Sequence, residues 1–365
     1  MEKYDSNRLN LSAFDHLDAY TDSFALLRGV ASDLLLGDSL TKSEPWLSVV
    51  IPTYRRSELL REALESVLRQ SPPGCEWELL VVDNTPLDEA GETPALRLIR
   101  TLDDPRVLYY HNRENIGPGY NWNRGVELAR GEWIVFLHDD DMLLPNALAN
   151  IGRQLRAYRG KKPLGYLHAR RVEFNGGRTV DQAVEARRYP PERLTRFGVL
   201  LSGGTGAGAP TCGTVIRKSA YMETGGINYD FGPSADAVLC YQLMRRYAVV
   251  LSDRVLGGYR WGDNESIKKE ALVQMIRADE HLSSYAYTLS PFARLWGGLF
   301  GAASSWRNIR QKNKIAQRYK VDITKNEFSE ATAYPEPSGM KKMAFLGFYA
   351  LYRLIRRGLG WFHAV

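Results

Sequence analysis

The sequence predicts an α/β protein built on a mostly parallel central sheet with helices on both faces. Short apolar segments rich in β-branched residues have the length and composition of buried strands, at 47–51, 77–83, 106–110 and 133–137. Segments with helical periodicity lie between them, at 57–70, 96–102 and 119–130. Strands and helices that alternate in this way form parallel sheets covered on both faces.

The chain divides into three regions. Residues 1–46 are expected to form an N-terminal helical extension, because apolar residues recur at helical spacing from Phe24 to Leu35. Residues 47–266 hold the alternating strands and helices, and residues 267–365 are expected to form a helical, basic and aromatic C-terminal region. A chain of 365 residues can bury a sizeable core in one large domain or two.

The composition restricts the partners of the chain. A net charge of +6 and a pI near 9.1 favour anions, and leave nucleotide phosphates, nucleic acid and anionic lipid open. Nucleic acid is not expected, because the basic residues do not surround an aromatic surface in the α/β region. Three scattered cysteines match no zinc or disulfide pattern, which favours a reducing, cytoplasmic setting. The N-terminus lacks a secretory pattern, and no apolar run reaches the roughly 20 residues of a membrane span.

An acidic triplet follows the strand predicted at 133–137. His138 comes first, and Asp139, Asp140 and Asp141 follow it in succession. Three adjacent carboxylates repel one another, so a cation is expected beside them, most simply a divalent metal with oxygen ligands. A solvated acidic turn is the alternative that this spacing leaves open.

Polar residues also follow the first two predicted strands. Thr53 to Arg55 follow the first strand, and Asp83 and Asn84 end the second. The carboxyl ends of parallel strands meet at the edge where α/β sheets bind ligands, so these residues are expected to converge with the acidic triplet. Such a set suits a nucleotide, with Asp83 accepting from a base N–H and the triplet holding a metal on a diphosphate.

Asp236 opens a segment of helical periodicity that spans residues 235–247. One interpretation is a carboxylate at a helix N-terminus, where the helix dipole favours negative charge. The other is a carboxylate base at the mouth of the cleft. The spacing of residues alone leaves both open.

Several blocks of sequence, in their order and spacing, resemble one known family. They are SVVIPTYRR at the first strand, ELLVVDN at the second, NRENIGPGYNWNRGVELARGEWIVFLHDDDMLLPNAL through the centre, and GTVIRKSAYMETGGIN followed by ADAVLCYQLMRRY. The chain resembles the family 2 glycosyltransferases, inverting enzymes with the GT-A fold, from about Leu47 to Ile267. The resemblance implies a Rossmann-like GT-A domain over 47–266, with helical extensions at both ends.

The resemblance also implies roles for individual residues. Asp236 is implied as the catalytic base, and Asp140 as the ligand of Mn²⁺ or Mg²⁺. In the family an Asp-x-Asp-Asp pattern ends the central strand, and here His138 stands at its first acidic position, with Asp139 as its candidate replacement. The implied donor-binding residues are Pro52, Thr53, Tyr54, Arg55, Asp83, Asn115, Gly117, His138 and Asp139.

The implied reaction is a single in-line displacement with inversion at the anomeric carbon. A hexosyl or deoxyhexosyl group passes from a UDP- or dTDP-linked donor to a hydroxyl of a saccharide acceptor, in cell-surface polysaccharide or glycolipid synthesis. The Gln-x-x-Arg-Trp signature of processive relatives is missing, since Gln242 is followed by Arg245 and Arg246 without the Trp. Transfer of one sugar per encounter is therefore expected.

The C-terminal tail suggests how the acceptor is presented. Residues 340–365 carry five Lys and Arg residues and no acidic residue, and their uncharged run from Met343 to Tyr352 is about half a membrane span. Such a helix can lie on a bilayer, which would place the protein peripherally on the cytoplasmic face with a lipid-linked acceptor. A helix that packs on the catalytic domain or on a second subunit is the alternative, and the oligomeric state is left open.

Two other functions are weighed. His138 and Ala235, which stands where the family has Glu, suggest a catalytically impaired nucleotide-sugar-binding protein. Gly203 to Gly208 suggest a dinucleotide loop and an oxidoreductase. The second hypothesis is weak, because Pro210 follows where a helix should begin and no strand–glycine–helix order is present.

Overall fold

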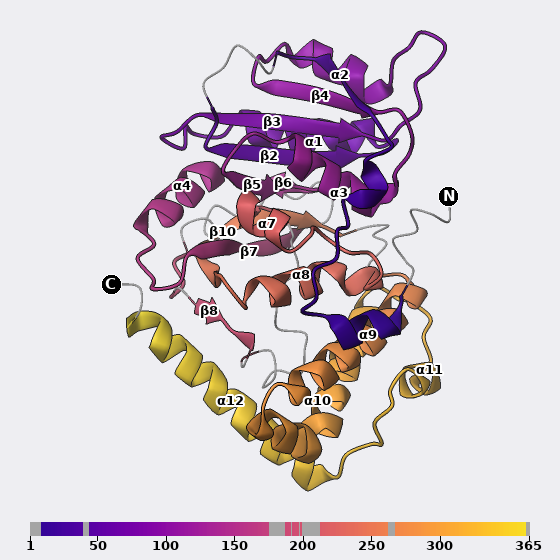
Figure 1. Cartoon of the computed structure of the whole chain (residues 1–365), viewed down its shortest axis with the longest axis vertical. Helices are drawn as coiled ribbons and strands as arrows, with labels where there is room; N and C mark the ends of the chain where they lie inside the picture. Colours follow the sequence, from indigo (N-terminus) through magenta and orange to yellow (C-terminus); the bar gives the residue numbers. More distant parts are fainter. Residues whose placement is uncertain are drawn as a thin grey trace.

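The computed structural model describes residues 9–38, 44–174, 187–190, 192–196, 198, 212–261 and 267–362. One ten-stranded sheet organises these residues, in the order β1-β4-β3-β2-β5-β9-β7-β10-β6, with β8 paired to β10 (Figure 1). Strands β4, β3, β2 and β5 run parallel to one another and form the expected βαβ half. They span Val107–Asn112, Trp77–Asp83, Leu47–Thr53 and Trp133–Phe136.

The second half of the sheet is mixed. Strands β7 and β10 pair in parallel, whereas β9 runs antiparallel to both β5 and β7, and β6 and β8 run antiparallel to β10. The α/β class predicted from the sequence is therefore confirmed, with antiparallel strands added beside and beyond the parallel ones. These strands span Met142–Leu143 (β6), Leu164–Phe174 (β7), Glu192–Leu194 (β8), Thr214–Arg217 (β9) and Ala248–Arg260 (β10).

Helices cover both faces of the sheet, and each face has its own apolar core. Helices α1, α2 and α4 supply the core on one face, and α3, α7, α8 and α9 supply most of the core on the other. The first set spans Ser57–Leu68, Pro94–Leu102 and Ala147–Ala157. The second spans Gly117–Leu128, Lys218–Glu223, Ala235–Leu243 and Lys269–Thr288, with the 3-10 turn η4, Gly232–Ser234, just before α8.

The N-terminal region differs from the expected helix. Residues 24–35 form a short 3-10 turn, η3 (Ala25–Leu27), and then enter strand β1 (Ser32–Leu36), while η2 spans Leu11–His16. Strand β1 pairs antiparallel with β4, and Asp33 forms an ion pair with Arg113. The backbone groups at the edge of β4 form hydrogen bonds with residues 32–36. These bonds outweigh the helical periodicity of the segment, because local propensity contributes little free energy.

The C-terminal region is helical, as expected. Helix α10 packs against α9, and α12 packs against α10, so that the three form one end of the molecule (Figure 1). Helices α10, α11 and α12 span Pro291–Arg318, Lys325–Glu330 and Gly339–Phe362. Among the described residues, every helix is too short or too polar to cross a bilayer. The division at 46/47 and 266/267 into separate domains stays a prediction.

Gly125 allows α3 to approach the sheet closely. A Cβ at this position would lie 2.3 Å from Val50 Cγ1, inside a fully buried region of β2. We therefore predict that Gly125→Ala destabilises the protein by about 1–3 kcal/mol in urea unfolding, because overpacking outweighs the higher helix propensity of Ala.

The matched control is Gly298→Ala in the exposed part of α10, where a Cβ would meet no atom within 4 Å. This change should stabilise the protein by about 0.5–1 kcal/mol. Equal effects of the two substitutions would contradict the close approach at Gly125.

Candidate active site

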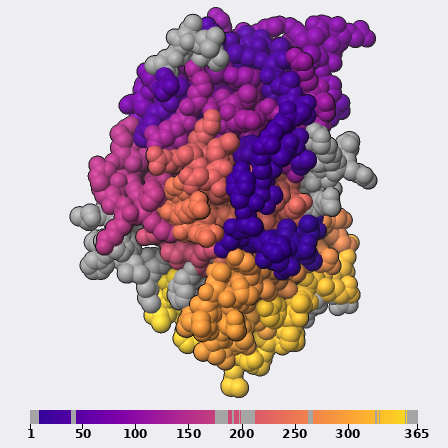
Figure 2. All heavy atoms as spheres, in the orientation of Figure 1, coloured from indigo at the N-terminus to yellow at the C-terminus, as the bar shows by residue number. Residues whose placement is uncertain are grey.

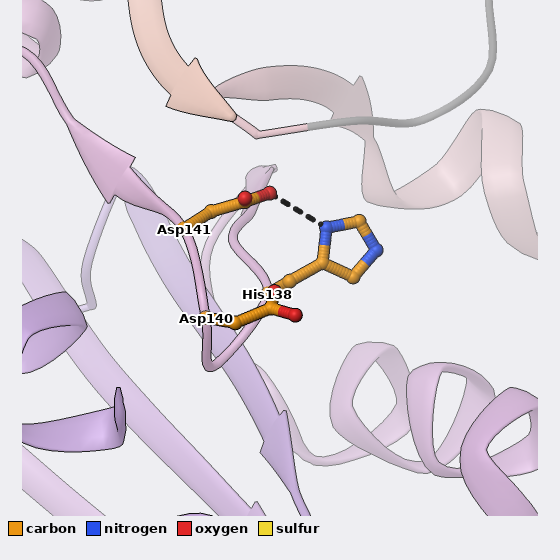
Figure 3. A group of neighbouring side chains, drawn as sticks. All are labelled: His138, Asp140 and Asp141. Atoms are coloured by element: carbon orange, nitrogen blue, oxygen red, sulfur yellow. Dashed lines mark hydrogen bonds and ion pairs between the residues drawn. The ribbon is translucent and has the colours of Figure 1, made fainter. Parts of the chain in front are cut away.

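The acidic triplet lies in a tight loop directly after β5. His138 Nδ1 lies 3.0 Å from Asp141 Oδ2, and one ligand atom each from His138, Asp140 and Asp141 lies within 4.8 Å of the others (Figure 3). Trp122 of α3 contacts the His138 ring edge-on, with ring centroids 5.2 Å apart. Burial opposes protonation of His138, but the hydrogen bond to Asp141 and the three carboxylates outweigh it and raise its pKa.

Asp139 connects this loop to the end of β2. Its Oδ2 accepts a hydrogen bond from Thr53 Oγ1 at 2.8 Å, and the residue is 7% exposed. Burial raises the pKa of Asp139 to about 6, with a further contribution from the charge of Asp140. Asp139 is therefore held by the protein itself and lies outside the group of candidate metal ligands.

Two arginines contact the triplet, and one of them, Arg56, forms an ion pair with its carboxylates. Arg56 Nη1 donates to Asp140 Oδ2 at 3.1 Å, and the Arg56 side chain is 39% exposed, so this ion pair lies at the surface of the rim. Arg260, at the end of β10, donates from its backbone N–H to Asp141 Oδ1 and from Nε to the Asp140 carbonyl. Neither arginine was predicted to lie in the site, and Arg260 is 120 residues from Asp140 in the chain.

The donor set of His138, Asp140 and Asp141 fits a divalent cation. Two carboxylates supply the hard oxygen ligands that Mg²⁺ and Mn²⁺ prefer, and the imidazole nitrogen favours Mn²⁺ over Mg²⁺. Asp140, the ligand implied by the resemblance, belongs to this set, and so does Asp141 of the predicted acidic triplet, whereas His138 was expected to contact the donor. The identity of the metal and the role of Asp140 stay predictions.

Asp83 ends β3 in a fully buried position. Its carboxylate accepts hydrogen bonds from Thr85 N–H at 2.7 Å, from Thr93 Oγ1 at 3.0 Å and from Tyr109 OH at 2.7 Å. The carboxylate therefore holds the loop between β3 and α2 in place. A contact between Asp83 and a nucleobase stays a prediction.

The other residues expected to bind a donor lie along the same edge. Tyr54 is 39% exposed, and the guanidinium of Arg55 lies 5.1 Å from its ring centroid. Arg55 has φ of 55°, a left-handed conformation that a non-glycine residue seldom adopts. Pro52, in β2, is half-buried.

The loop before α3 is tied to this edge through side-chain amides. Asn115 Oδ1 accepts from Gly117 N–H at 2.9 Å, and the Gly117 carbonyl accepts from Asn84 at the end of β3 at 3.1 Å. Asn112 donates to both Asn84 and Asn121 at 2.8 Å. Asn115 and Gly117 thus lie beside the end of β3, and their contact with a donor, which the family resemblance implied, stays a prediction.

Asp236 lies half-buried in the first turn of α8, where its Oδ1 accepts from Ala237 N–H at 2.6 Å. Burial raises the pKa of Asp236 to about 6, and the charges of His138, Lys312 and Arg171 partly oppose this rise. The charge of His138, in the acidic loop, therefore acts on Asp236. Lys312 and Arg171 were missed in the sequence, since neither lies in a recognisable motif.

An α/β sheet with an acidic loop at its carboxyl edge and a second carboxylate coupled to that loop defines a glycosyltransferase of the GT-A fold. The family model described as Glycosyl transferase family 2 matches residues 48–249, more than half of the chain. The chain belongs to this family.

Among its relatives, an uncharacterized protein of Mycobacterium tuberculosis, MT1568, is 29% identical over 221 residues, 58% of this chain and 66% of that protein. A GalNAc(5)-diNAcBac-PP-undecaprenol beta-1,3-glucosyltransferase of Campylobacter jejuni is 36% identical over 110 residues, 29% of this chain and 33% of that protein. The chain thus spans between one third and two thirds of the length of these relatives. The crystal structure of S. aureus TarS 1-349 aligns with a TM-score of 0.46 and 14% identity, over 84% of this chain and 91% of that one.

The hypothesis of a dinucleotide-dependent oxidoreductase gains no support from these findings. The family assignment favours glycosyl transfer, and residues 203–208, on which that hypothesis rested, lie outside the described residues.

We predict that saturating Mn²⁺ raises the melting temperature by about 3 °C or more, because a ligand that binds only the folded state stabilises it. His138→Ala and Asp140→Asn should each remove most of this rise in differential scanning fluorimetry. Glu89→Gln, in the exposed loop before α2, is the control and should keep it. An unchanged rise in Asp140→Asn would contradict the assigned ligand set.

Proposed function

We propose that this chain is an inverting, non-processive glycosyltransferase that moves one hexosyl or deoxyhexosyl group from a UDP- or dTDP-linked donor to a saccharide hydroxyl. The observation that carries the proposal is the match to the family 2 model together with the cluster of His138, Asp140 and Asp141 after β5, and the charge of His138 also acts on the pKa of Asp236. One carboxylate can accept a proton while the loop receives the departing diphosphate.

On the donor side, Thr53, Tyr54 and Arg55 contact the nucleotide base and ribose, and Asn115 and Gly117 flank the donor. Asp83 supports this surface through the loop that it holds, or contacts the base. His138, Asp140 and Asp141 would hold Mn²⁺ or Mg²⁺, which neutralises negative charge on a diphosphate. Asp139 and Thr53 fix the loop against β2.

On the acceptor side, Asp236 takes the proton of the attacking hydroxyl. The bond between the acceptor oxygen and the anomeric carbon forms as the bond from that carbon to the diphosphate breaks, so the configuration inverts. A carboxylate with a pKa of about 6 remains mostly ionised at pH 7 and is more basic than an ordinary Asp. General base catalysis of this kind contributes about 10² to 10⁴ in rate.

We predict that Asp236→Asn lowers the rate of glycosyl transfer by about 10² to 10⁴. The melting temperature at pH 7 should stay the same or rise, because the folded state favours the neutral form of Asp236 and the ionised form therefore costs stability at pH 7. Nucleotide release in the presence of donor, Mn²⁺ and acceptor measures the rate.

In the wild type the rate should fall as the pH drops through about 6, where Asp236 takes up a proton and can no longer accept one. A rate that is independent of pH between 5 and 8, or full activity in Asp236→Asn, would contradict its role as base. A wild type that binds nucleotide sugar and never turns it over would support the alternative of an impaired binding protein, which His138 and Ala235 suggest.

The exposed faces of α10 and α12 suggest that the acceptor is presented at a membrane. Phe348 of α12 contacts the rings of Trp296 and Phe300 of α10, at 5.7 and 5.5 Å between centroids. Large apolar side chains on both helices remain exposed, namely Phe292, Leu295, Leu299, Met340, Met343, Phe348, Leu351 and Leu354. We refer to these eight residues as the apolar face.

The charge of the two helices is of one sign. Helices α10 and α12 contain six and five Lys or Arg residues, and neither contains Asp or Glu. They form the lower end of the molecule in Figure 2. An exposed apolar face on two helices of positive net charge suits an anionic bilayer, on which an amphipathic helix lies in the interface plane. We therefore include a lipid-linked saccharide at the cytoplasmic face as the acceptor, in cell-surface polysaccharide or glycolipid synthesis.

The double substitution Met343→Glu and Leu351→Glu should lower binding to vesicles of phosphatidylcholine and phosphatidylglycerol by about tenfold or more, since two buried apolar side chains are lost from the bilayer. Co-sedimentation measures the bound fraction. Leu26→Glu with Leu87→Glu is the control, because it changes the net charge equally at exposed apolar residues outside α10 and α12. Equal binding of the two double variants would contradict the membrane proposal.

A further inference from the structure

A buried pair of opposite charges joins α9 to α10. Asp279 of α9 is 3% exposed, and its Oδ2 has no hydrogen-bond partner among the described residues. Lys312 Nζ lies 3.8 Å from this oxygen and donates to Met275 Sδ at 3.4 Å, and the Lys312 side chain is 14% exposed. A thioether and a distant carboxylate compensate a buried ammonium poorly, so this pair costs more in desolvation than a close ion pair does.

The pair joins two helices, one of which packs against the turn before the proposed catalytic base. Helix α9 packs against η4, the turn that immediately precedes α8 and Asp236. The charge of Lys312 lowers the pKa of both Asp236 and Asp279, and the charge of Asp236 raises the pKa of Asp279. Because repulsion between two carboxylates is reciprocal, the charge of Asp279 also opposes ionisation of Asp236. The charged and titratable groups that interact with Asp236 come from six parts of the chain, namely His138 after β5, Tyr166 and Arg171 in β7, Tyr229 before η4, Cys240 in α8, Asp279 in α9 and Lys312 in α10.

We infer that Asp279 and Lys312 are positioning residues, through which the C-terminal helices set the charge on Asp236. This inference rests on the proposed function, in which Asp236 is the base. Lys312 favours the ionised base, and Asp279 opposes it while holding the ammonium in place. Both residues lie beyond residue 249, where the match to the family model ends.

The opposite signs of the two charges make the inference testable. Burial raises the pKa of Asp236 to about 6 despite the opposing charge of Lys312. Removing the ammonium should raise that pKa further, and removing the negative charge of Asp279 should lower it. A pair with a purely structural role would weaken the protein when either residue is changed, and would not move the titration of Asp236 in opposite directions.

The first experiment measures nucleotide release from UDP-glucose with Mn²⁺ between pH 4.5 and 8. The acidic limb of the profile should move up by about half to one pH unit in Lys312→Met and down by a similar amount in Asp279→Asn. Lys314→Met and Glu270→Gln are matched controls on the exposed faces of the same two helices, and should leave the limb in place. If the acidic limb of the pH–rate profile lies at the wild-type pH in both Lys312→Met and Asp279→Asn, the inference is overturned.

The second experiment needs no turnover and therefore separates this inference from the proposed function. Lys312→Met should destabilise the protein at pH 7 more when Asp236 is present than in the Asp236→Asn background, as measured by urea unfolding. This difference should disappear at pH 4.5, where Asp236 is protonated. If the wild type shows no turnover but the two backgrounds still differ, the proposed function is refuted and the action of Lys312 on Asp236 is upheld. Equal destabilisation in both backgrounds would refute the pair's action on Asp236.

Discussion

Carboxylates held out of water at the carboxyl edge of the sheet are the constraint on which this site depends. Asp139 is 7% and Asp141 1% exposed, and burial works against the ionised form of both. Each therefore needs a donor or a cation, and the fold brings these from other elements. Thr53 comes from β2, and the backbone N–H of Arg260 comes from β10. The site is in this sense a product of the sheet's mixed topology, because β10 reaches the loop through its antiparallel pairing with β6.

The need of buried carboxylates for a nearby cation also connects the sheet to the helical end of the molecule. Asp236 in α8 is coupled to His138 on the sheet side and to Lys312 on the helical side. Helices α9 and α10 therefore do more than extend the core. Helix α9 packs against the turn before the proposed base, and α10 continues to the apolar face that it forms with α12. One helix thus contributes to both the electrostatics of the site and the surface proposed to meet a bilayer.

Much of the fold was predictable because its signals are local. The strands of the parallel half and the helices between them follow from apolar periodicity, which burial on both faces of a sheet imposes directly on the sequence. The edge strand β1 was not predictable in this way. Its residues carry helical spacing, and they form a strand only because β4 offers unpaired backbone groups. The convergence of Thr53, Asn84 and the acidic loop followed from the topological rule for parallel strands.

The sequence by itself determined the α/β class, the family and the acidic loop, because each depends on patterns of residues that are close together in the chain. Only the tertiary structure decided which charges meet. Arg56 and Arg260 lie against the triplet, Asp83 is enclosed by Thr93 and Tyr109, and Lys312 acts on Asp236. The physical reason is that Coulomb interactions and desolvation depend on distance and burial in space, and neither is encoded by separation along the chain.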